Sequence, residues 1–279
     1  MKIPRIIFNF NDRCINQCPF CFIPFDGKGV GTPELWKRIL DRMDDFSPDL
    51  LSFSGCDPLY YDDFYDVLAE KEKRCLWGVD ASLMFLNKSK FANVASKLDL
   101  FSSSLDDTPE MPFPQRYSKR RLETFYDNLD FVRKFFPNLV LHTLCTPKNK
   151  DYIEKIADFI IEKKIKTWSL YQFWPFEFIE NSERFVISDE EFAKIGRRVS
   201  NYCQGKTDFE FVFNKGRGNG YFFVSSIGEV YTTVDDTPAK YLRLGSIFDD
   251  DIAEKWYYNS TPEKTSQILS LKLNRETRK

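Results

Sequence analysis

Three cysteines lie within eight residues of the chain, in the segment "CINQCPFC": Cys14, Cys18 and Cys21. Thiolates spaced this closely usually hold a metal, and metal sites made only of cysteine usually contain four of them. The next cysteine is Cys56, no second CxxC follows, and the chain has one histidine, His142. A zinc ion would need a fourth protein ligand. A cluster with three thiolates and one open iron would need none, and its open iron would bind a small molecule.

The charge balance of the chain argues against broad nucleic-acid binding. Its 279 residues include 40 Lys and Arg and 42 Asp and Glu, for a formal net charge of −2, and broad phosphate neutralisation needs an excess of positive charge. No run approaches the roughly 18 apolar residues that a membrane helix needs, and the first residues are too polar for a signal peptide. We therefore expect a cytoplasmic protein that does not enter a membrane, in which crowded cysteines indicate metal binding or redox chemistry.

The elements that must position these cysteines alternate regularly along the chain. Short apolar segments are followed by amphipathic, helix-like segments, which predicts a parallel sheet with helices packed outside it. The expected strands cover residues 5–10, 49–55, 75–81, 98–106, 138–146 and 167–176. Six such units are too few for a closed eight-stranded barrel, so we predict an α/β fold, a partial (β/α)6 TIM-like barrel. Function in such sheets gathers at the carboxyl ends of the strands.

The final third of the sequence has a different character. We predict that residues 1–185 form the partial barrel and that residues 186–279 form a small, β-rich C-terminal α+β extension. A capped helix is expected over 188–203, followed by short strands and a loose C-terminal tail. Cys203 is the one cysteine in this extension and none follows it, so the extension lacks the set of thiolates that an additional cluster would need.

The cysteine segment resembles the cluster motif of the radical S-adenosylmethionine (SAM) superfamily, CxxxCxΦC with an aromatic Φ, and matches it in full with Phe20 as the aromatic residue. The resemblance implies that Cys14, Cys18 and Cys21 hold one [4Fe–4S] cluster. It also implies that the amino and carboxylate groups of SAM chelate the fourth iron, which would account for the missing ligand.

A second segment resembles the Gly-Gly-Glu-Pro element that follows the second strand in this superfamily. Here the strand "LLSFSG" runs into "SGCDP": Gly55 keeps the first glycine, Cys56 replaces the second, Asp57 replaces the glutamate, and Pro58 remains. The resemblance implies that this segment binds the methionine ammonium of SAM. An ordinary Gly/Asp/Pro turn is the alternative.

Other strand ends resemble the family more weakly. Asp80 lies in "GVDAS", where the family contacts the methionine or ribose of SAM, and Ser104 lies in "SSLD", where it contacts the ribose. His142 lies around the end of the fifth strand, as a candidate cofactor contact or catalytic base, and Gln172 lies at the end of the sixth, where the family contacts adenine or substrate. For each of these residues a capping or loop-satisfying role is the alternative.

The resemblance also implies an activity. One electron from the reduced cluster would cleave the S–C5′ bond of SAM, and the resulting 5′-deoxyadenosyl radical would abstract hydrogen from a substrate. We expect a reductant such as flavodoxin or ferredoxin as partner. The string "FVISDEEF" (185–192) is similar to the viperin-like group of nucleotide dehydratases, which implies a small or nucleotide-like substrate. Seven basic residues are candidates for a phosphate-binding ring, or are surface charges: Lys119, Arg120, Arg121, Lys148, Lys150, Lys215 and Arg217.

Two alternatives to this activity remain open from the sequence. The first is a radical SAM maturase that modifies a ribosomally synthesised peptide, although no module that would recognise a precursor peptide is evident. The second is a non-catalytic zinc or iron–sulfur binding protein, which would not cleave SAM after reconstitution and reduction.

Overall fold

The computed structural model describes residues 1–10, 14–24, 30–112, 114–234 and 238–266; the predicted C-terminal tail lies largely outside this part. The described strands form one sheet in the order β10-β9-β8-β1-β2-β3-β4-β5-β6-β7. Their bounds are β1 Arg5–Asn9, β2 Leu50–Ser54, β3 Leu76–Ala81, β4 Leu100–Ser104, β5 Val140–Cys145, β6 Thr167–Gln172, β7 Asp208–Val212, β8 Phe223–Ser225, β9 Glu229–Val234 and β10 Lys240–Ser246.

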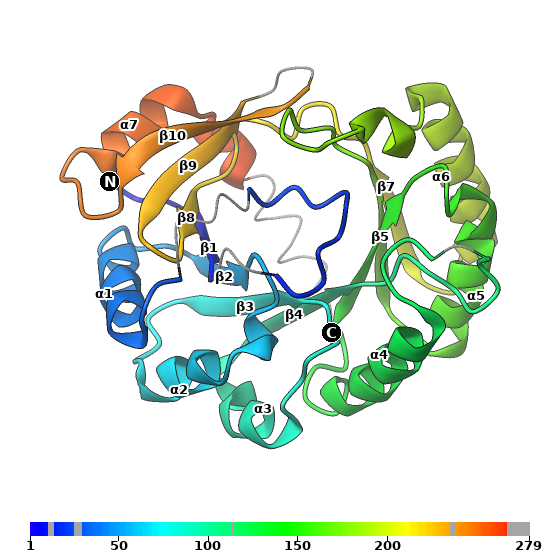
Figure 1. Ribbon diagram of the computed structural model, residues 1–279, viewed down its shortest axis with the longest axis horizontal. Coiled ribbons are helices and arrows are strands. Elements are labelled where there is room, and N and C mark those ends of the chain that lie inside the picture. Colours follow the sequence, from blue (N-terminus) through cyan, green and yellow to red (C-terminus); the bar gives the residue numbers. More distant parts are fainter. Residues whose placement is uncertain (11–13, 25–29, 113, 235–237, 267–279) are drawn as a thin grey trace.

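The strands from β8 through β1 to β7 all pair in parallel, and β9 and β10 add an antiparallel hairpin beyond β8. The sheet curves without closing, because β7 and β10 are its two edges. An isolated parallel bridge between Phe176 and Ala239 links the segment after β6 to the segment before β10. Figure 1 shows the strands as an open ring with the helices around its outside.

A helix follows each of the first six strands. They are α1 Pro33–Asp44, α2 Asp62–Glu70, α3 Lys88–Val94, α4 Lys119–Val132, α5 Ile153–Glu162 and α6 Asp189–Cys203, and α7 Ile252–Asn259 lies beside the hairpin; short 3-10 turns cover Pro58–Tyr60, Ala95–Lys97, Lys150–Tyr152 and Ser182–Phe185. The predicted partial (β/α)6 TIM-like barrel is therefore confirmed. The sheet runs across residue 185 through β7 to β10, and the division into 1–185 and 186–279 stays a prediction.

Side-chain caps mark the starts of α1 and α6, and the helices bury their apolar faces on the sheet. The Thr32 side chain accepts a hydrogen bond from the Leu35 amide of α1, and Pro33 occupies the first turn, where no backbone donor is needed. Ser188 caps α6 in the same way through the Glu191 amide. The outer face of the sheet and the helices form the main hydrophobic core.

A smaller aromatic cluster lies apart from that core. It consists of Phe20, Phe173, Trp174, Phe176, Ile179, Phe185 and Ala239. These residues come from the cysteine loop, the segment after β6 and the segment before β10, so the cluster joins the cysteine loop to the far side of the sheet. Among the described residues, no helix has the length and apolar character needed to cross a membrane.

Candidate active site

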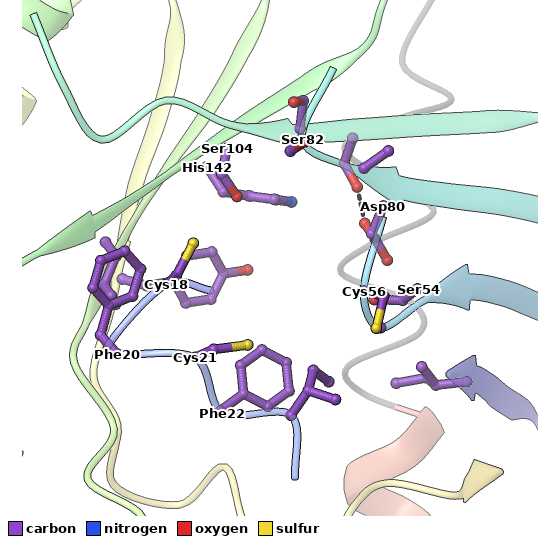
Figure 2. A pocket seen from close by; sticks show the side chains of 18 of the residues that line it. Cys18, Phe20, Cys21, Phe22, Ser54, Cys56, Asp80, Ser82, Ser104 and His142 are labelled. Atoms are coloured by element: carbon purple, nitrogen blue, oxygen red, sulfur yellow. Dashed lines mark hydrogen bonds between the residues drawn. The ribbon is translucent and has the colours of Figure 1, made fainter. Parts of the chain in front are cut away.

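The inside of the curved sheet holds a cavity of about 330 Å³. Its walls come from the cysteine loop after β1, the carboxyl-terminal parts of β2 to β6, and the segment between β7 and β8. Of the residues predicted from the sequence, those that line it are Cys14, Cys18, Phe20, Cys21, Gly55, Cys56, Asp80, Ser104 and His142. Figure 2 shows most of these side chains around one space. Asp57, Pro58 and Gln172 are not among the lining residues.

The cysteine loop is held by a turn and by aromatic packing. The Cys21 amide donates to the Cys18 carbonyl at 3.0 Å, and the buried Phe20 ring packs edge-on against Phe185 with 5.8 Å between centroids. The Arg116 guanidinium lies 5.0 Å from the Phe20 centroid, and its Nη1 lies 3.6 Å from the Cys18 sulfur. The packing of the buried Phe20 ring therefore holds the loop that contains the three cysteines in place.

The three thiols lie in different electrostatic surroundings. A hydrogen bond with Cys56 lowers the pKa of Cys14 to about 7. Burial raises the pKa of Cys18 and raises that of Cys21 to about 12. Thiolates, not thiols, bind metals, so metal binding at this loop must release protons, chiefly from Cys18 and Cys21.

The donor set of this loop bears on which metal group it could bind. Among the described residues, no three Cys, His, Asp or Glu side chains gather as ligands for one metal ion. Zinc with Zn–S bonds of about 2.3 Å needs sulfurs only about 3.8 Å apart. A [4Fe–4S] cluster binds each thiolate through a different iron, so its ligand sulfurs lie farther apart than those of a zinc ion. Three cysteine thiols around one cavity fit the donor set of a cluster with one open iron.

The turn after β2 brings the backbone close to β1. Gly55 and Cys56 both have positive φ, 72° and 57°, and a Cβ on Gly55 would overlap the Asn9 side chain. Asn9 donates its amide to the Tyr231 hydroxyl, and its buried Oδ1 has no hydrogen-bond partner in the described part of the chain. Glycine at position 55 is therefore required both by the backbone conformation and by the space.

Asp57 ties two loops together. Its Oδ1 accepts from the Leu59 amide at 3.2 Å, and its Oδ2 accepts from the Ser82 amide at 3.3 Å and from the Ser82 hydroxyl. The carboxylate thus caps the turn that begins at Pro58 and fixes the loop after β3 to the loop after β2. Burial raises the pKa of Asp57 above its ordinary value.

Asp80, Ser104 and His142 lie on three strands that face the cavity (Figure 2). Asp80 accepts a hydrogen bond from the Ser102 hydroxyl, and its Oδ2 lies 3.9 Å from Nη2 of Arg5. The His142 ring packs edge-on against Tyr171, with centroids 5.3 Å apart. These groups combine one carboxylate, one hydroxyl and one imidazole at the cavity wall.

Gln172 is fully engaged outside the cavity. Its Nε2 donates to the Ile187 carbonyl at 3.1 Å and to Asp189 at 3.0 Å, and its Oε1 accepts from the Asn214 amide at 3.1 Å. The side chain therefore joins the end of β6 to the start of α6 and the end of β7.

Sequence reasoning missed several lining residues. Arg116, whose guanidinium pairs with the buried Asp106, was not predicted, and neither were Tyr171, Trp174 and Tyr221. No short motif marks them, because they come from segments far apart in the chain. Of the seven basic residues suggested for a phosphate ring, the lining of the cavity includes Arg217 alone.

These features define a class: a partial α/β barrel whose cysteine loop opens into a cavity at the carboxyl ends of its strands. The family model "Radical SAM superfamily" matches residues 8–160, more than half of the chain. The chain belongs to the radical SAM superfamily, whose members are enzymes that use a [4Fe–4S] cluster and SAM.

One similar curated protein is the S-adenosylmethionine-dependent nucleotide dehydratase RSAD2 of Oncorhynchus mykiss. It is 24% identical over 210 residues, which are 69% of this chain and 60% of that protein. The chain thus spans less than two thirds of that relative's length. The similarity agrees with the predicted resemblance to the viperin-like group.

Solved structures with the same fold include two proteins that have been solved with bound peptides. SuiB of Streptococcus suis bound to S-adenosylmethionine has a TM-score of 0.68 and 16% identity, covering 96% of this chain and 68% of SuiB. The protein anSMEcpe with bound AdoMet has a TM-score of 0.74 and 15% identity, covering 99% of this chain and 88% of its own. SuiB has also been solved with its precursor peptide SuiA, and anSMEcpe with the Cp18Cys peptide.

Proposed function

We propose that Cys14, Cys18 and Cys21 bind a single [4Fe–4S] cluster, that SAM binds beside it in the cavity, and that the substrate is small or nucleotide-like. The observation that carries this proposal is that the three thiols and the ends of β2 to β5 line one cavity. When bound, the cluster and SAM supply a 5′-deoxyadenosyl radical, which abstracts hydrogen from the substrate.

The side chains of this chain hold and orient these groups. We assign Gly55 and Cys56 to the methionine end of SAM, because Gly55 leaves its backbone open to the cavity. Asp80, Ser104 and His142 are assigned to the ribose and adenine, since they line the next strands of the sheet. Phe20 anchors the cysteine loop, while Asp57, Pro58 and Gln172 position loops around the cavity. Enclosure by the sheet restricts water around a reactive species.

Similarity to a nucleotide dehydratase supports the nucleotide-like substrate. A peptide maturase is the second candidate, and it is favoured by a different observation: SuiB and anSMEcpe, both solved with peptides, share the fold over nearly the whole chain. Membership in an enzyme superfamily counts against the third alternative, a non-catalytic metal protein. A cytoplasmic location and a flavodoxin or ferredoxin as electron donor complete the proposal.

The proposal is tested by anaerobic reconstitution with iron and sulfide, reduction, and addition of SAM. We expect about four irons per chain and formation of 5′-deoxyadenosine. Individual ribonucleotides and short peptides are then added in parallel reactions. Stimulation by a nucleotide supports the first candidate, and stimulation by a peptide alone supports the second. A bound zinc ion with no 5′-deoxyadenosine would contradict both.

A further inference from the structure

Three arginines line the cavity, and two of them have a carboxylate partner. Nη2 of Arg5 lies 3.9 Å from Asp80, and Arg116 pairs with the buried Asp106. For Arg217, the described residues provide no carboxylate partner, and its charged or polarisable neighbours are tyrosines. The positive charge of Arg217 is therefore the one among these three arginines that no described carboxylate balances.

Aromatic rings enclose Arg217. Its guanidinium carbon lies 4.8 Å from the Trp174 ring centroid and 5.0 Å from that of Tyr171. It also shares a side-chain hydrogen bond with Tyr221. Ring contacts of this kind cover the faces of a guanidinium and leave its five in-plane N–H donors to bind acceptors. One hydroxyl satisfies only part of that capacity.

A neighbouring basic residue shows the ordinary alternative. Lys215, two positions earlier, is exposed and pairs with Asp189 on α6. It does not line the cavity. Arg217, in contrast, lies in the cavity wall, where a charge that no carboxylate of the described residues balances is unfavourable. An anionic group in the cavity would remove that penalty and would use the remaining donors.

Arg217 is not one of the residues that we assign to SAM, and the Tyr171 ring lies between it and one of them, His142. Tyr171 ends β6, and Arg217 follows β7, whereas Gly55 follows β2; β3, β4 and β5 separate these strands. The carboxylate of SAM is expected at the cysteine loop. Since the proposed function uses the carboxylate of SAM at the open iron, an anion beside Arg217 would come from the second reactant.

We propose that Arg217 binds an anionic oxygen group of the substrate, a phosphate or a carboxylate, with Tyr171 and Trp174 holding the guanidinium in place. This inference rests on the proposed function, since it assumes a small second reactant in the SAM-containing cavity. It narrows that function by excluding neutral and cationic substrates. It also makes Arg217 a residue that determines substrate specificity.

The test uses the anaerobically reconstituted holoenzyme with SAM and measures binding by calorimetry. The probes are the four ribonucleoside triphosphates, their uncharged nucleosides, inorganic triphosphate and a small dicarboxylate, succinate. The variants are Arg217→Gln and Arg217→Lys, with Lys215→Gln as a control that removes a nearby exposed charge. Thermal melting of each variant verifies folding, and Arg217→Lys keeps the charge if the glutamine variant does not fold.

A hydrogen bond to a charged group is worth a factor of about 10 to 100 in affinity. We expect at least one anionic probe to bind the wild type, with its affinity about 10-fold or more lower in Arg217→Gln, intermediate in Arg217→Lys and within about 2-fold of wild type in Lys215→Gln. Preference for nucleotides or for succinate identifies phosphate or carboxylate as the source of the anion.

The outcomes separate the inference from the proposed function. Nucleotide binding that is unchanged in both Arg217 variants overturns the inference and leaves a nucleotide-like substrate standing. Binding of inorganic triphosphate or succinate that depends on Arg217, without nucleotide binding, supports the inference and removes the nucleotide. Tight binding of uncharged nucleosides that is indifferent to Arg217 overturns the inference, and so does the absence of binding by every anionic probe.

Discussion

The two sides of the cavity are built in different ways. One side, which we call the cysteine wall, consists of Cys14, Cys18, Cys21, Gly55 and Cys56, from two short loops. A second group of lining residues, the aromatic wall, consists of Tyr171, Phe173, Trp174, Arg217, Tyr221 and Phe223, from β6, β8 and the segments that follow β6 and precede β8. The first is made of thiols and backbone, and the second of large rings around one cation.

This difference separates residues that bind a cofactor common to a class of enzymes from residues that recognise one particular substrate. Cofactor ligands must meet fixed bond lengths, so they come from short segments with fixed spacing. A substrate is recognised by shape and by a few polar groups, which can come from any segment that the fold brings together. The cysteine wall therefore reports the class of enzyme, and the aromatic wall reports the individual substrate.

The largest expected effect comes from the cysteine wall. Cys18→Ala removes one of three proposed cluster ligands, and we expect the iron content after reconstitution and the formation of 5′-deoxyadenosine to fall to background. Iron and sulfide analysis and the visible absorption of the cluster measure the loss. Cys203→Ala is the matched control, because this thiol is buried in α6. A Cys18→Ala protein with a full cluster and normal SAM cleavage would refute the assignment.

The next effect tests the backbone of the same wall. Gly55→Ala introduces a Cβ that overlaps the Asn9 side chain at a positive φ of 72°. We expect a loss of about 2–4 kcal/mol in the free energy of unfolding, from strain and from displacement of Asn9. Denaturant unfolding of the metal-free protein measures it.

Gly205 provides a matched control for that substitution. It has nearly the same φ, 71°, but no atom within 4 Å of an added Cβ. Gly205→Ala therefore isolates the backbone strain, and we expect it to destabilise by about 1 kcal/mol. Equal losses in the two variants would show that the contact with Asn9 contributes nothing.

The aromatic wall is expected to respond in substrate binding and not in cluster assembly. Tyr171→Leu removes a ring that packs on Arg217 and on His142. We expect about 5-fold weaker binding of the substrate identified by its stimulation of SAM cleavage, because a cation–π contact is worth about 1 kcal/mol. Iron content should remain that of the wild type. Tyr258→Leu, at a residue that is 91% exposed, is the control. Loss of the cluster in Tyr171→Leu would show that the aromatic wall also contributes to cluster assembly.

The contrast between the walls also explains what the sequence could predict. The cluster motif and the alternation of strands and helices are local patterns, and both lead to the correct fold and superfamily. Ser104 was chosen because it ends β4, where parallel strands end at the same edge of the sheet, whereas His142 lies inside β5 and lines the cavity from there. Asp106 and Arg116 form an ion pair across a loop, and Arg217 contacts Tyr171 because β6 and β7 are neighbours in the sheet. Such tertiary contacts produce no fixed spacing in the sequence from which they could be predicted.

Two residues show the limit of a motif more sharply. Asp57 occupies the position of the glutamate in the family segment, yet in this structure it caps a turn and binds Ser82. Gln172 lies at a strand end, yet α6 and the end of β7 take up its amide. Each side chain was assigned from its position on a strand or loop, and its direction depended on neighbours that are distant in sequence.

The smallest effect concerns the pH dependence that Asp57 introduces. Burial raises its pKa in the folded protein above the ordinary 3.8. Between 3.8 and that raised value the folded state binds more protons than the unfolded state, so stability falls as pH rises through this window and levels off above it. Asp57→Asn keeps an acceptor for the Leu59 amide and cannot ionise. The variant should therefore gain stability relative to the wild type with rising pH, by at most about 1.4 kcal/mol per pH unit.

Denaturant unfolding of both proteins across this pH range measures the difference. Asp189→Asn supplies a control of opposite sign, because a hydrogen bond from Lys215 lowers the pKa of the exposed Asp189. Its carboxylate stabilises the fold above the unfolded pKa, and that contribution is lost as pH falls through the folded pKa. If the wild type instead becomes more stable relative to Asp57→Asn as pH rises, the hydrogen bonds from Ser82 and Leu59 lower the pKa of Asp57 by more than burial raises it. The ionised carboxylate would then stabilise the contact between the loop after β2 and the loop after β3.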